Sequence, residues 1–320
     1  MVDGCLVVYK PKGITSHDVI AKIRRVYKIK KCGHAGTLDP MAQGVLLVFF
    51  GKALKLINFI PTEHLDKNYL ARLTLGSTTD SYDATGKVIS VFEGSTDYSA
   101  DTIADAIKPL VGKYNQMPPA YSAIKVDGKK AYAMARAGQE VKLEARPVEV
   151  ASIRVAGDVN IDGKRNLLIR VHCSRGTYVR SLIHDLGQNL GCGAYLSYLL
   201  RERVGKWDYV HAFPYWKLEK GVPFENDSAF TKFEDVLSCP KIKVRKDTMF
   251  KINNGQTLDK RDVASVQTTN DEISELFQII SYDNKLVAIY STQKGNLKPD
   301  ETNCEFKLFP MRVFHEDEAD

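Results

Sequence analysis

The most constraining stretch of this sequence is the run Gly33 to Gly44, GHAGTLDPMAQG, which leads directly into the apolar run Val45–Phe50. Its glycines permit backbone conformations that other residues resist, and Pro40 fixes the turn after Asp39. The run VLLVFF is β-branched and aromatic and has the length of a buried strand. Asp39 is therefore a candidate reactive group, because a stiff loop beside a core strand can hold one carboxylate in a fixed place. The alternative is a structural turn with a capping Asp.

Strand and helix patterns alternate through most of the chain. Strands are predicted where β-branched and aromatic residues run together or alternate with polar ones, at Cys5–Tyr9, Lys67–Leu75, Lys87–Phe92, Asn166–Cys173 and Tyr195–Leu200. Helices are predicted where apolar residues recur at helical spacing, after the capping-box pair Thr15 and Asp18, at Asp101–Val111 and at Val179–Leu190. On the Lys67–Leu75 strand, Tyr69 shares the apolar face.

The C-terminal part of the chain has a different pattern. Residues Glu219 to Ser238 are polar, and we interpret them as a linker. Beyond Lys241, short alternating runs at Glu275–Tyr282, Lys285–Tyr290 and Cys304–Phe314 are typical of a small β-domain. Residues 316–320 are mostly acidic and are expected to fray. A chain of 320 residues also exceeds one typical domain, so two domains are expected.

Positive charge is concentrated at the N-terminal end. The whole chain has a net charge of +6, but residues 1–60 alone carry ten Lys and Arg against three Asp. This basic end includes the Asp39 loop, so a polyanion such as nucleic acid is the natural partner to consider. A solvated lysine-rich face would have the same composition.

Several other classes of protein are not indicated. The six cysteines are scattered without C-x-x-C spacing, so neither a zinc site nor a disulfide framework is expected. No apolar run approaches the length of a signal peptide or a membrane span, so we expect a cytoplasmic protein without membrane contact. Gly44 and Gly51-Lys52 do not form a phosphate-binding P-loop, because six residues rather than four separate the glycines and Ala53 replaces the Ser or Thr that would meet magnesium.

Four motifs, in order and with their spacing, resemble those of the TruB family, the bacterial-type tRNA pseudouridine synthases that act on the T-loop uridine at tRNA position 55. They are Lys10–Ser16 (KPKGITS), the Gly33–Gly44 loop, Tyr69 with Thr79–Asp83 (TDSYD), and Cys173–Arg180 (CSRGTYVR). The resemblance implies an α+β fold, in which helices flank a central mixed, largely antiparallel sheet. It also implies a catalytic domain at 1–238, with an insertion at about 121–146 that grips RNA, and a small β-rich PUA-like RNA-binding domain at 241–315.

The resemblance also implies a set of site residues. Asp39 would be the catalytic aspartate, paired with Arg180, and Tyr69 would stack on the uracil. The remaining implied substrate-binding residues are His34 near the flipped nucleotide, Tyr178 and Leu199 in the pocket wall, Asp83, and Lys10. Two departures from the family pattern are Tyr9, where an Asp is usual, and Leu200, where some members have an Arg.

Uridine isomerisation oxidises nothing and loses no group, so the implied reaction requires neither a metal nor a cofactor. The implied partner is the T-arm of tRNA; no protein partner is implied, and we expect a monomer. Two alternatives stay open. One is an RNA-binding or tRNA-folding protein whose chemistry is secondary or absent. The other is an enzyme of another class, such as a nucleoside hydrolase that uses Asp39.

Overall fold

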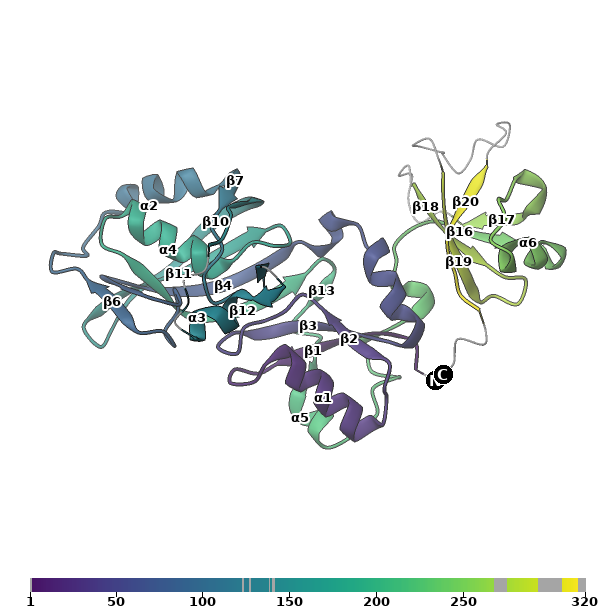
Figure 1. The fold of residues 1–320 in the computed structure, drawn as a ribbon, viewed down its shortest axis with the longest axis horizontal. Helices are drawn as coiled ribbons and strands as arrows, with labels where there is room; N and C mark the ends of the chain where they lie inside the picture. The colour runs from purple at the N-terminus through teal and green to yellow at the C-terminus, as the bar shows by residue number, and fades with distance from the viewer. Residues whose placement is uncertain are drawn as a thin grey trace.

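A computed structural model describes residues 2–122, 124–126, 128–137, 139, 142–267, 275–292 and 307–315. It contains a large mixed sheet with helices packed on it and a separate, smaller C-terminal sheet (Figure 1). This architecture confirms the predicted α+β fold with a β-rich C-terminal part. Among the described residues, no helix is long and apolar enough to span a membrane.

Eleven strands of the described chain form the large sheet, and most neighbours are antiparallel. The central order is β14 (Phe213–Pro214), β1 (Gly4–Lys10), β3 (Gln43–Phe50), β12 (Ala194–Val204), β4 (Lys67–Leu75), β11 (Lys164–Cys173), β10 (Arg146–Ile161) and β7 (Gly112–Gln116). Three further strands pair at its sides: β2 (Cys32–Ala35) with β3, β13 (Trp207–Asp208) with β12, and β15 (Phe230–Lys232) with β1. A short parallel contact between β12 and β3 joins the two halves of the sheet, with Arg201 opposite Gly44. The Asp39 loop lies at this junction.

Helices cover the sheet where apolar stripes meet it. The helices of the large domain are α1 (Ser16–Tyr27), α2 (Ala100–Ile107), α3 (Ala131–Arg136), α4 (Val179–Asn189) and α5 (Tyr215–Glu219), whereas α6 (Met249–Asn253) packs on the C-terminal sheet. Short 3-10 helices are η1 (Gly51–Phe59), η2 (Thr62–Leu65), η3 (Lys108–Leu110), η4 (Phe233–Asp235), η5 (Lys246–Thr248) and η6 (Lys260–Asp262). The predicted capping box at Thr15 and Asp18 is confirmed at the start of α1. Helix α4 packs on β12 and β4, which places its first turn beside the Asp39 loop.

Two small hairpins project from this core. The hairpin of β5 (Ser77–Thr79) and β6 (Val88–Val91) confirms the strand predicted at Lys87–Phe92, although all four residues of β6 are exposed. The other hairpin, β8 (Lys125–Val126) with β9 (Lys129–Lys130), precedes α3 within the predicted insertion.

The predicted linker from Glu219 to Ser238 is wrong, because this segment is part of the main core. Phe224 is fully buried, and its ring lies 5.1 Å from those of Tyr27 and Phe50. Strand β15 pairs with β1, and Phe233 is buried as well. The polar average of the segment hides its few apolar residues, each of which is inserted into the core.

The C-terminal sheet has the order β17 (Val263–Gln267), β16 (Lys241–Val244), β18 (Leu276–Ile280), β19 (Leu286–Thr292) and β20 (Leu308–Val313). Its last three strands confirm the predicted alternating runs; residues 304–306 and the tail 316–320 lie outside the described residues. The sheet has its own apolar core around Tyr290, and it also packs against the large domain, where the ring of Phe314 lies 5.0 Å from that of Phe233.

Candidate active site

Glycines shape the two ends of the Asp39 loop. Gly36 (φ 80°) and Gly44 (φ 107°) both adopt left-handed backbone conformations that favour glycine. A Cβ at Gly44 would lie 2.3 Å from the carbonyl oxygen of Arg201, so β12 could not approach β3 if another residue stood there. These glycines therefore set the position of the loop relative to the sheet.

The start of α1 anchors the tip of the loop. The Ser16 hydroxyl accepts from the Leu38 amide at 2.8 Å and donates to the Leu38 carbonyl at 3.1 Å. The Gly13 amide donates to the Pro40 carbonyl at 2.8 Å. Both neighbours of Asp39 are thus fixed through their backbones, which leaves the carboxylate as the part of the loop free to act.

Arg201 anchors the other side of the loop, and sequence reasoning missed it. Its side chain is almost fully buried. Its guanidinium donates to the carbonyls of Val45 at 2.7 Å, Gly36 at 3.0 Å and Thr37 at 3.4 Å. The available signal was a cation within the apolar strand pattern of β12, because a charge at such a position needs buried partners.

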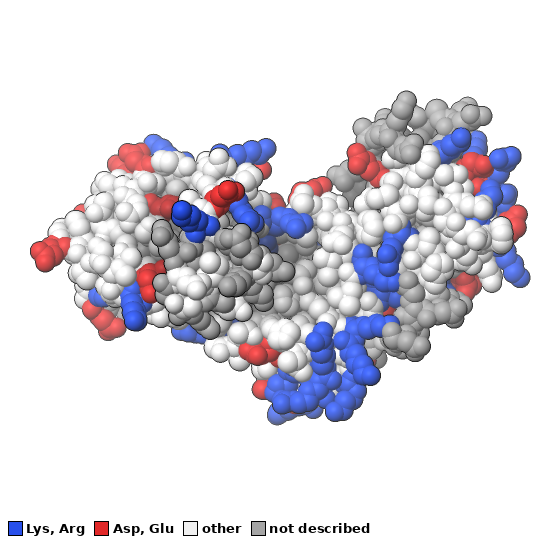
Figure 2. Space-filling model, viewed as in Figure 1, with Lys and Arg blue, Asp and Glu red and all other residues white. Residues whose placement is uncertain are grey.

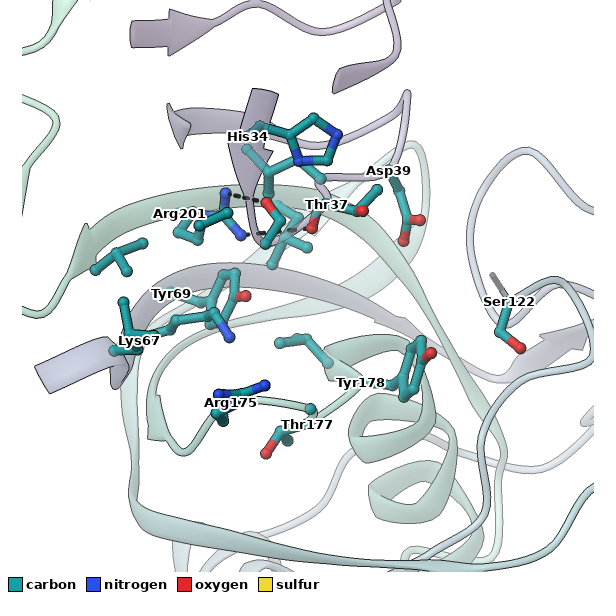
Figure 3. A pocket seen from close by; sticks show the side chains of 18 of the residues that line it. His34, Thr37, Asp39, Lys67, Tyr69, Ser122, Arg175, Thr177, Tyr178 and Arg201 are labelled. Atoms are coloured by element: carbon teal, nitrogen blue, oxygen red, sulfur yellow. Dashed lines mark hydrogen bonds between the residues drawn. The ribbon is translucent and has the colours of Figure 1, made fainter. Parts of the chain in front are cut away.

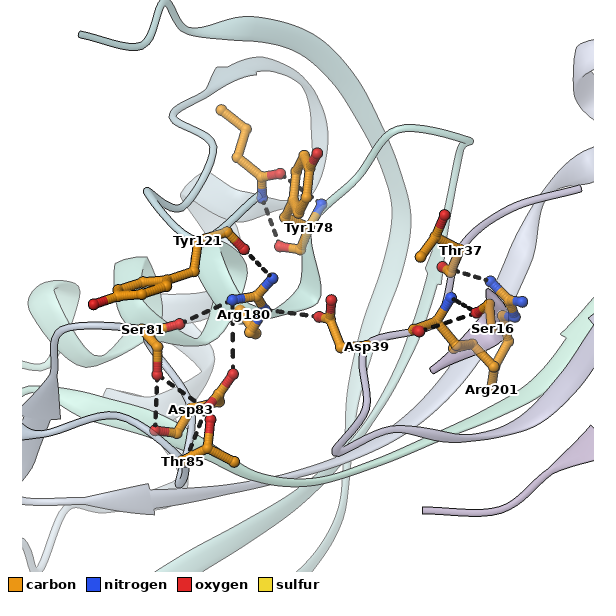
Figure 4. A network of polar contacts seen from close by, with 12 residues as sticks. Ser16, Thr37, Asp39, Ser81, Asp83, Thr85, Tyr121, Tyr178, Arg180 and Arg201 are labelled. Atoms are coloured by element: carbon orange, nitrogen blue, oxygen red, sulfur yellow. Dashed lines mark hydrogen bonds and ion pairs between the residues drawn. The ribbon is translucent and has the colours of Figure 1, made fainter. Parts of the chain in front are cut away.

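The structure brings Asp39 and Arg180 together, as the resemblance implies. The Arg180 Nε lies 2.8 Å from an Asp39 carboxylate oxygen, although its N–H is not aimed at that oxygen, so the contact is an ion pair rather than a linear hydrogen bond. Arg180 also donates to the carbonyls of Ser81 at 3.2 Å and Tyr121 at 3.0 Å (Figure 4). The arginine is buried, whereas the Asp39 side chain is 35% exposed and reaches the cavity.

Asp83 supports Arg180 from the side away from the cavity. One Asp83 oxygen lies 3.6 Å from an Arg180 Nη. The other accepts from the Ser81 hydroxyl at 2.9 Å and from the amide and hydroxyl of Thr85 at 2.9 and 2.5 Å. Arg180 is therefore shared between two carboxylates, and only Asp39 faces the cavity.

Asp39 and Arg180 line a cavity of about 510 Å³, part of whose lining Figure 3 shows. Six of the predicted site residues line it: His34, Asp39, Tyr69, Tyr178, Arg180 and Leu199. Residues that line it without having been predicted include Lys67, Ser122, Arg175 and Arg201. Side chains from β2, β4, β12, α4 and their connecting loops thus converge on one space.

The aromatic and imidazole groups of the cavity are held in neutral forms. Burial raises the pKa of Tyr69 to about 12, and burial also raises the pKa of Tyr178. Burial, and then the charges of Arg201 and His17, lower the pKa of His34, so the imidazole is neutral near pH 7. The side chain of Gln116 fixes Tyr178 by bonding to both its amide and its carbonyl, at 2.8 and 3.2 Å.

Two of the predicted substrate-binding residues, Lys10 and Asp83, do not line the cavity. Lys10 is fully buried, and its ammonium donates to the carbonyls of Pro11 at 2.9 Å and Ile14 at 2.7 Å. Burial lowers its pKa to about 8, and the charge of Asp39 opposes that shift. Lys10 therefore closes the turn before α1. Asp83 is likewise buried, behind Arg180.

Comparison with known proteins identifies the family. The model described as TruB family pseudouridylate synthase (N terminal domain) matches residues 24–179. The tRNA pseudouridine synthase B of Thermosipho melanesiensis is 36% identical over 303 residues, which cover 95% of this chain and 93% of that protein. The enzyme of the same name from Clostridioides difficile is 38% identical over 285 residues, covering 87% and 91%. This chain belongs to the TruB family.

Solved structures give the same fold for this TruB family member. A Cbf5-Nop10-Gar1 complex contains a chain 26% identical to this one, with a TM-score of 0.65 over 98% of this chain and 85% of that one. An H/ACA RNP bound to a substrate RNA containing 2'-deoxyuridine gives a TM-score of 0.67 at 24% identity, covering 98% and 85%, and shows a shared fold.

Proposed function

We propose that this chain isomerises a uridine of tRNA to pseudouridine, at position 55 of the T-loop. The observation that carries the proposal is the Asp39–Arg180 pair, 2.8 Å apart, in a cavity that also holds Tyr69. The membership of the TruB family and the relatives named tRNA pseudouridine synthase B support the same activity.

The reaction needs one carboxylate and no net supply of atoms. The bond from uracil N1 to the ribose C1′ breaks, the uracil turns, and a bond from C5 to C1′ forms, while the C5 proton is lost and N1 gains one. Asp39 supplies the reactive carboxylate, either as a nucleophile towards the sugar carbon or as a base towards a sugar proton. Arg180 stabilises its negative charge in the buried setting. The cavity walls retain the detached uracil until it is rejoined.

Tyr69 provides a flat, neutral surface on which the uracil can stack. Extracting a base from a folded loop costs about a few kcal/mol. Stacking on an aromatic side chain returns roughly 1–3 kcal/mol per base. A buried tyrosine on the rigid strand β4 therefore offsets much of the cost of flipping, and it does so only when the base is in the cavity.

Replacing Tyr69 by Leu is expected to lower kcat by about 5- to 150-fold, since a loss of stacking of roughly 1–3 kcal/mol falls on the flipped state. The affinity for T-arm RNA should change by less than about 10-fold, because most of it comes from phosphate contacts elsewhere. Single-turnover kinetics and filter binding measure the two quantities. Tyr209→Leu, on an exposed side chain outside the cavity lining, is the matched control. Unchanged turnover in Tyr69→Leu would remove Tyr69 from the site.

The N-terminal basic surface offers phosphate contacts outside the cavity. Exposed Lys and Arg side chains gather over α1 and α5 (Figure 2), namely Arg24, Arg25, Lys28, Lys30, Lys31 and Lys220. Beside them Trp216 is 53% exposed, and the Lys220 ammonium lies 5.3 Å from its ring centre. Cations interleaved with an exposed aromatic ring suit an RNA backbone with unpaired bases.

We also propose roles for the domains of this chain and for its insertion. Residues 1–238 form the catalytic domain, and the insertion at about 121–146 grips the T-arm. This role for the insertion is supported by its start at Tyr121, whose carbonyl accepts from Arg180. Residues 241–315 are the PUA-like RNA-binding domain. The protein acts as a cytoplasmic monomer without a metal or cofactor.

Incubating T-arm RNA with the protein, digesting the RNA and identifying the nucleosides tests the proposal. Pseudouridine at the T-loop position is the expected product. Free uracil with an abasic site would instead indicate a nucleoside hydrolase. Unchanged RNA that is nevertheless bound and refolded would indicate an RNA-folding protein, and either result would overturn the proposal.

A further inference from the structure

Among the described residues, the lining of the catalytic cavity carries more positive charge than its one carboxylate can neutralise. Four permanent or nearly permanent cations line the cavity, Lys67, Arg175, Arg180 and Arg201, against the single carboxylate of Asp39. Arg180 already pairs with Asp39 and Asp83. Within the part of the chain that the structure describes, no ion pair involves Lys67, Arg175 or Arg201.

Strand pairing in the large sheet brings the three cations to the same end of the cavity. Lys67 and Tyr69 are two residues apart on β4, so their side chains leave the same face of the strand. Lys67 is paired directly with Cys173 at the end of β11, and Arg175 follows two residues later in the turn before α4. Figure 3 shows Lys67, Arg175 and Arg201 around Tyr69, with Asp39 and Tyr178 on the other side of the cavity.

The cations repel one another in the absence of an anion. Burial, and then the charge of Arg201, lower the pKa of the Lys67 ammonium to about 8. Arg175 adds to this shift, whereas Cys173 and the Asp66 carboxylate oppose it without cancelling it. Arg201 donates to the backbone carbonyls of Val45, Gly36 and Thr37, which carry no net charge. Arg175 is exposed at the cavity rim, so an anion that arrives from solvent can reach it. Clustered cations around a cavity are stabilised when such an anion binds.

We propose that Lys67 and Arg175 form a phosphodiester subsite of the catalytic cavity, which holds a backbone phosphate flanking the flipped uridine. Arg201 adds its charge from behind while it positions the Asp39 loop. The inference rests on the proposed function, because it takes RNA as the ligand. When the uracil stacks on Tyr69 and the attached C1′ faces Asp39, the phosphates that flank this nucleotide lie near the cavity rim, where Arg175 is exposed. The subsite would fix the sugar while the base turns, since the phosphate stays attached to the ribose throughout.

A protein–RNA double-substitution cycle tests this subsite. T-arm RNAs are prepared with an uncharged methylphosphonate at each linkage flanking the target uridine, one at a time, and at one remote linkage. The reference RNA carries the same 2′-O-methyl groups that these linkages require. The dissociation constant of each RNA is measured for the wild-type protein, Arg175→Gln, Lys67→Gln and the matched control Arg154→Gln, which carries the same change on an exposed residue of β10 outside the cavity lining.

In the wild-type protein and in Arg154→Gln, one flanking methylphosphonate should weaken binding by about 10- to 100-fold, the effect of one charge-assisted contact. In Arg175→Gln and Lys67→Gln, the cost of the same replacement should fall by at least about 3-fold relative to the wild-type protein, because one of the two cationic partners of that phosphate is already lost. Equal costs in all four proteins at every linkage would overturn the subsite. Pseudouridine formation by the wild-type protein on unmodified RNA is scored separately, so the subsite can fail while the proposed activity stands.

Discussion

The Asp39→Asn variant is expected to form no detectable pseudouridine, with a rate at least about 10⁴-fold below that of the wild-type protein. An amide is neither a nucleophile nor a base under these conditions, and no second carboxylate lines the cavity within the described residues. The change is nearly isosteric, and the backbone bonds of Ser16 and Gly13 still hold the loop. Binding of T-arm RNA should therefore stay within about threefold, because it depends on phosphate contacts.

Single-turnover nucleoside analysis and filter binding on one protein preparation check both halves of this result. Asp105→Asn is the matched control, since it makes the same change on an exposed residue of α2 and should leave both quantities unchanged. Measurable pseudouridine from Asp39→Asn would contradict the proposed mechanism. Loss of RNA binding together with activity would show that Asp39 acts mainly in holding the site together.

Replacing Arg180 by Met is expected to lower the free energy of unfolding by about 3–5 kcal/mol, because it leaves the buried Asp83 charge without its partner. It also removes the donors to Ser81 and Tyr121. Turnover should fall by about 100-fold or more even in the folded fraction, as the Asp39 carboxylate loses the group that orients it. Arg180→Lys keeps the charge but not the fork, so its effects should have the same sign and a smaller size.

Urea unfolding and single-turnover rates separate the two effects of Arg180. The matched control is Arg170→Met, whose exposed guanidinium lies 3.5 Å from Glu202 and should contribute less than about 1 kcal/mol. Equal stability losses in Arg180→Met and Arg170→Met would show that the Asp83–Arg180 contact does not stabilise the fold. Full turnover in Arg180→Met would remove Arg180 from the catalytic group.

Local patterns predicted several elements well. The alternation of Lys67–Leu75 gave both strand β4 and the face that carries Tyr69. The pair Thr15 and Asp18 predicted the start of α1, because a capping box acts between residues three apart. The glycines and proline around Asp39 predicted a fixed loop, and the ordered motifs indicated its family. Each of these features depends on residues that are close in the chain.

Longer-range features were decided by the tertiary structure alone. The buried Lys10, the core position of Phe224 and the gathering of Lys67 with Arg175 follow from strand pairing and packing between distant segments. Arg201 is the clearest case: its guanidinium reaches the Val45 carbonyl across 156 positions of sequence, through the parallel contact of β12 with β3. Sequence by itself determined that one acid sits on a rigid glycine loop. Strand register decided which buried groups donate hydrogen bonds to that loop and which cations lie beside its carboxylate. Hydrogen bonds and ion pairs act over a few ångströms of space, whatever the separation along the chain.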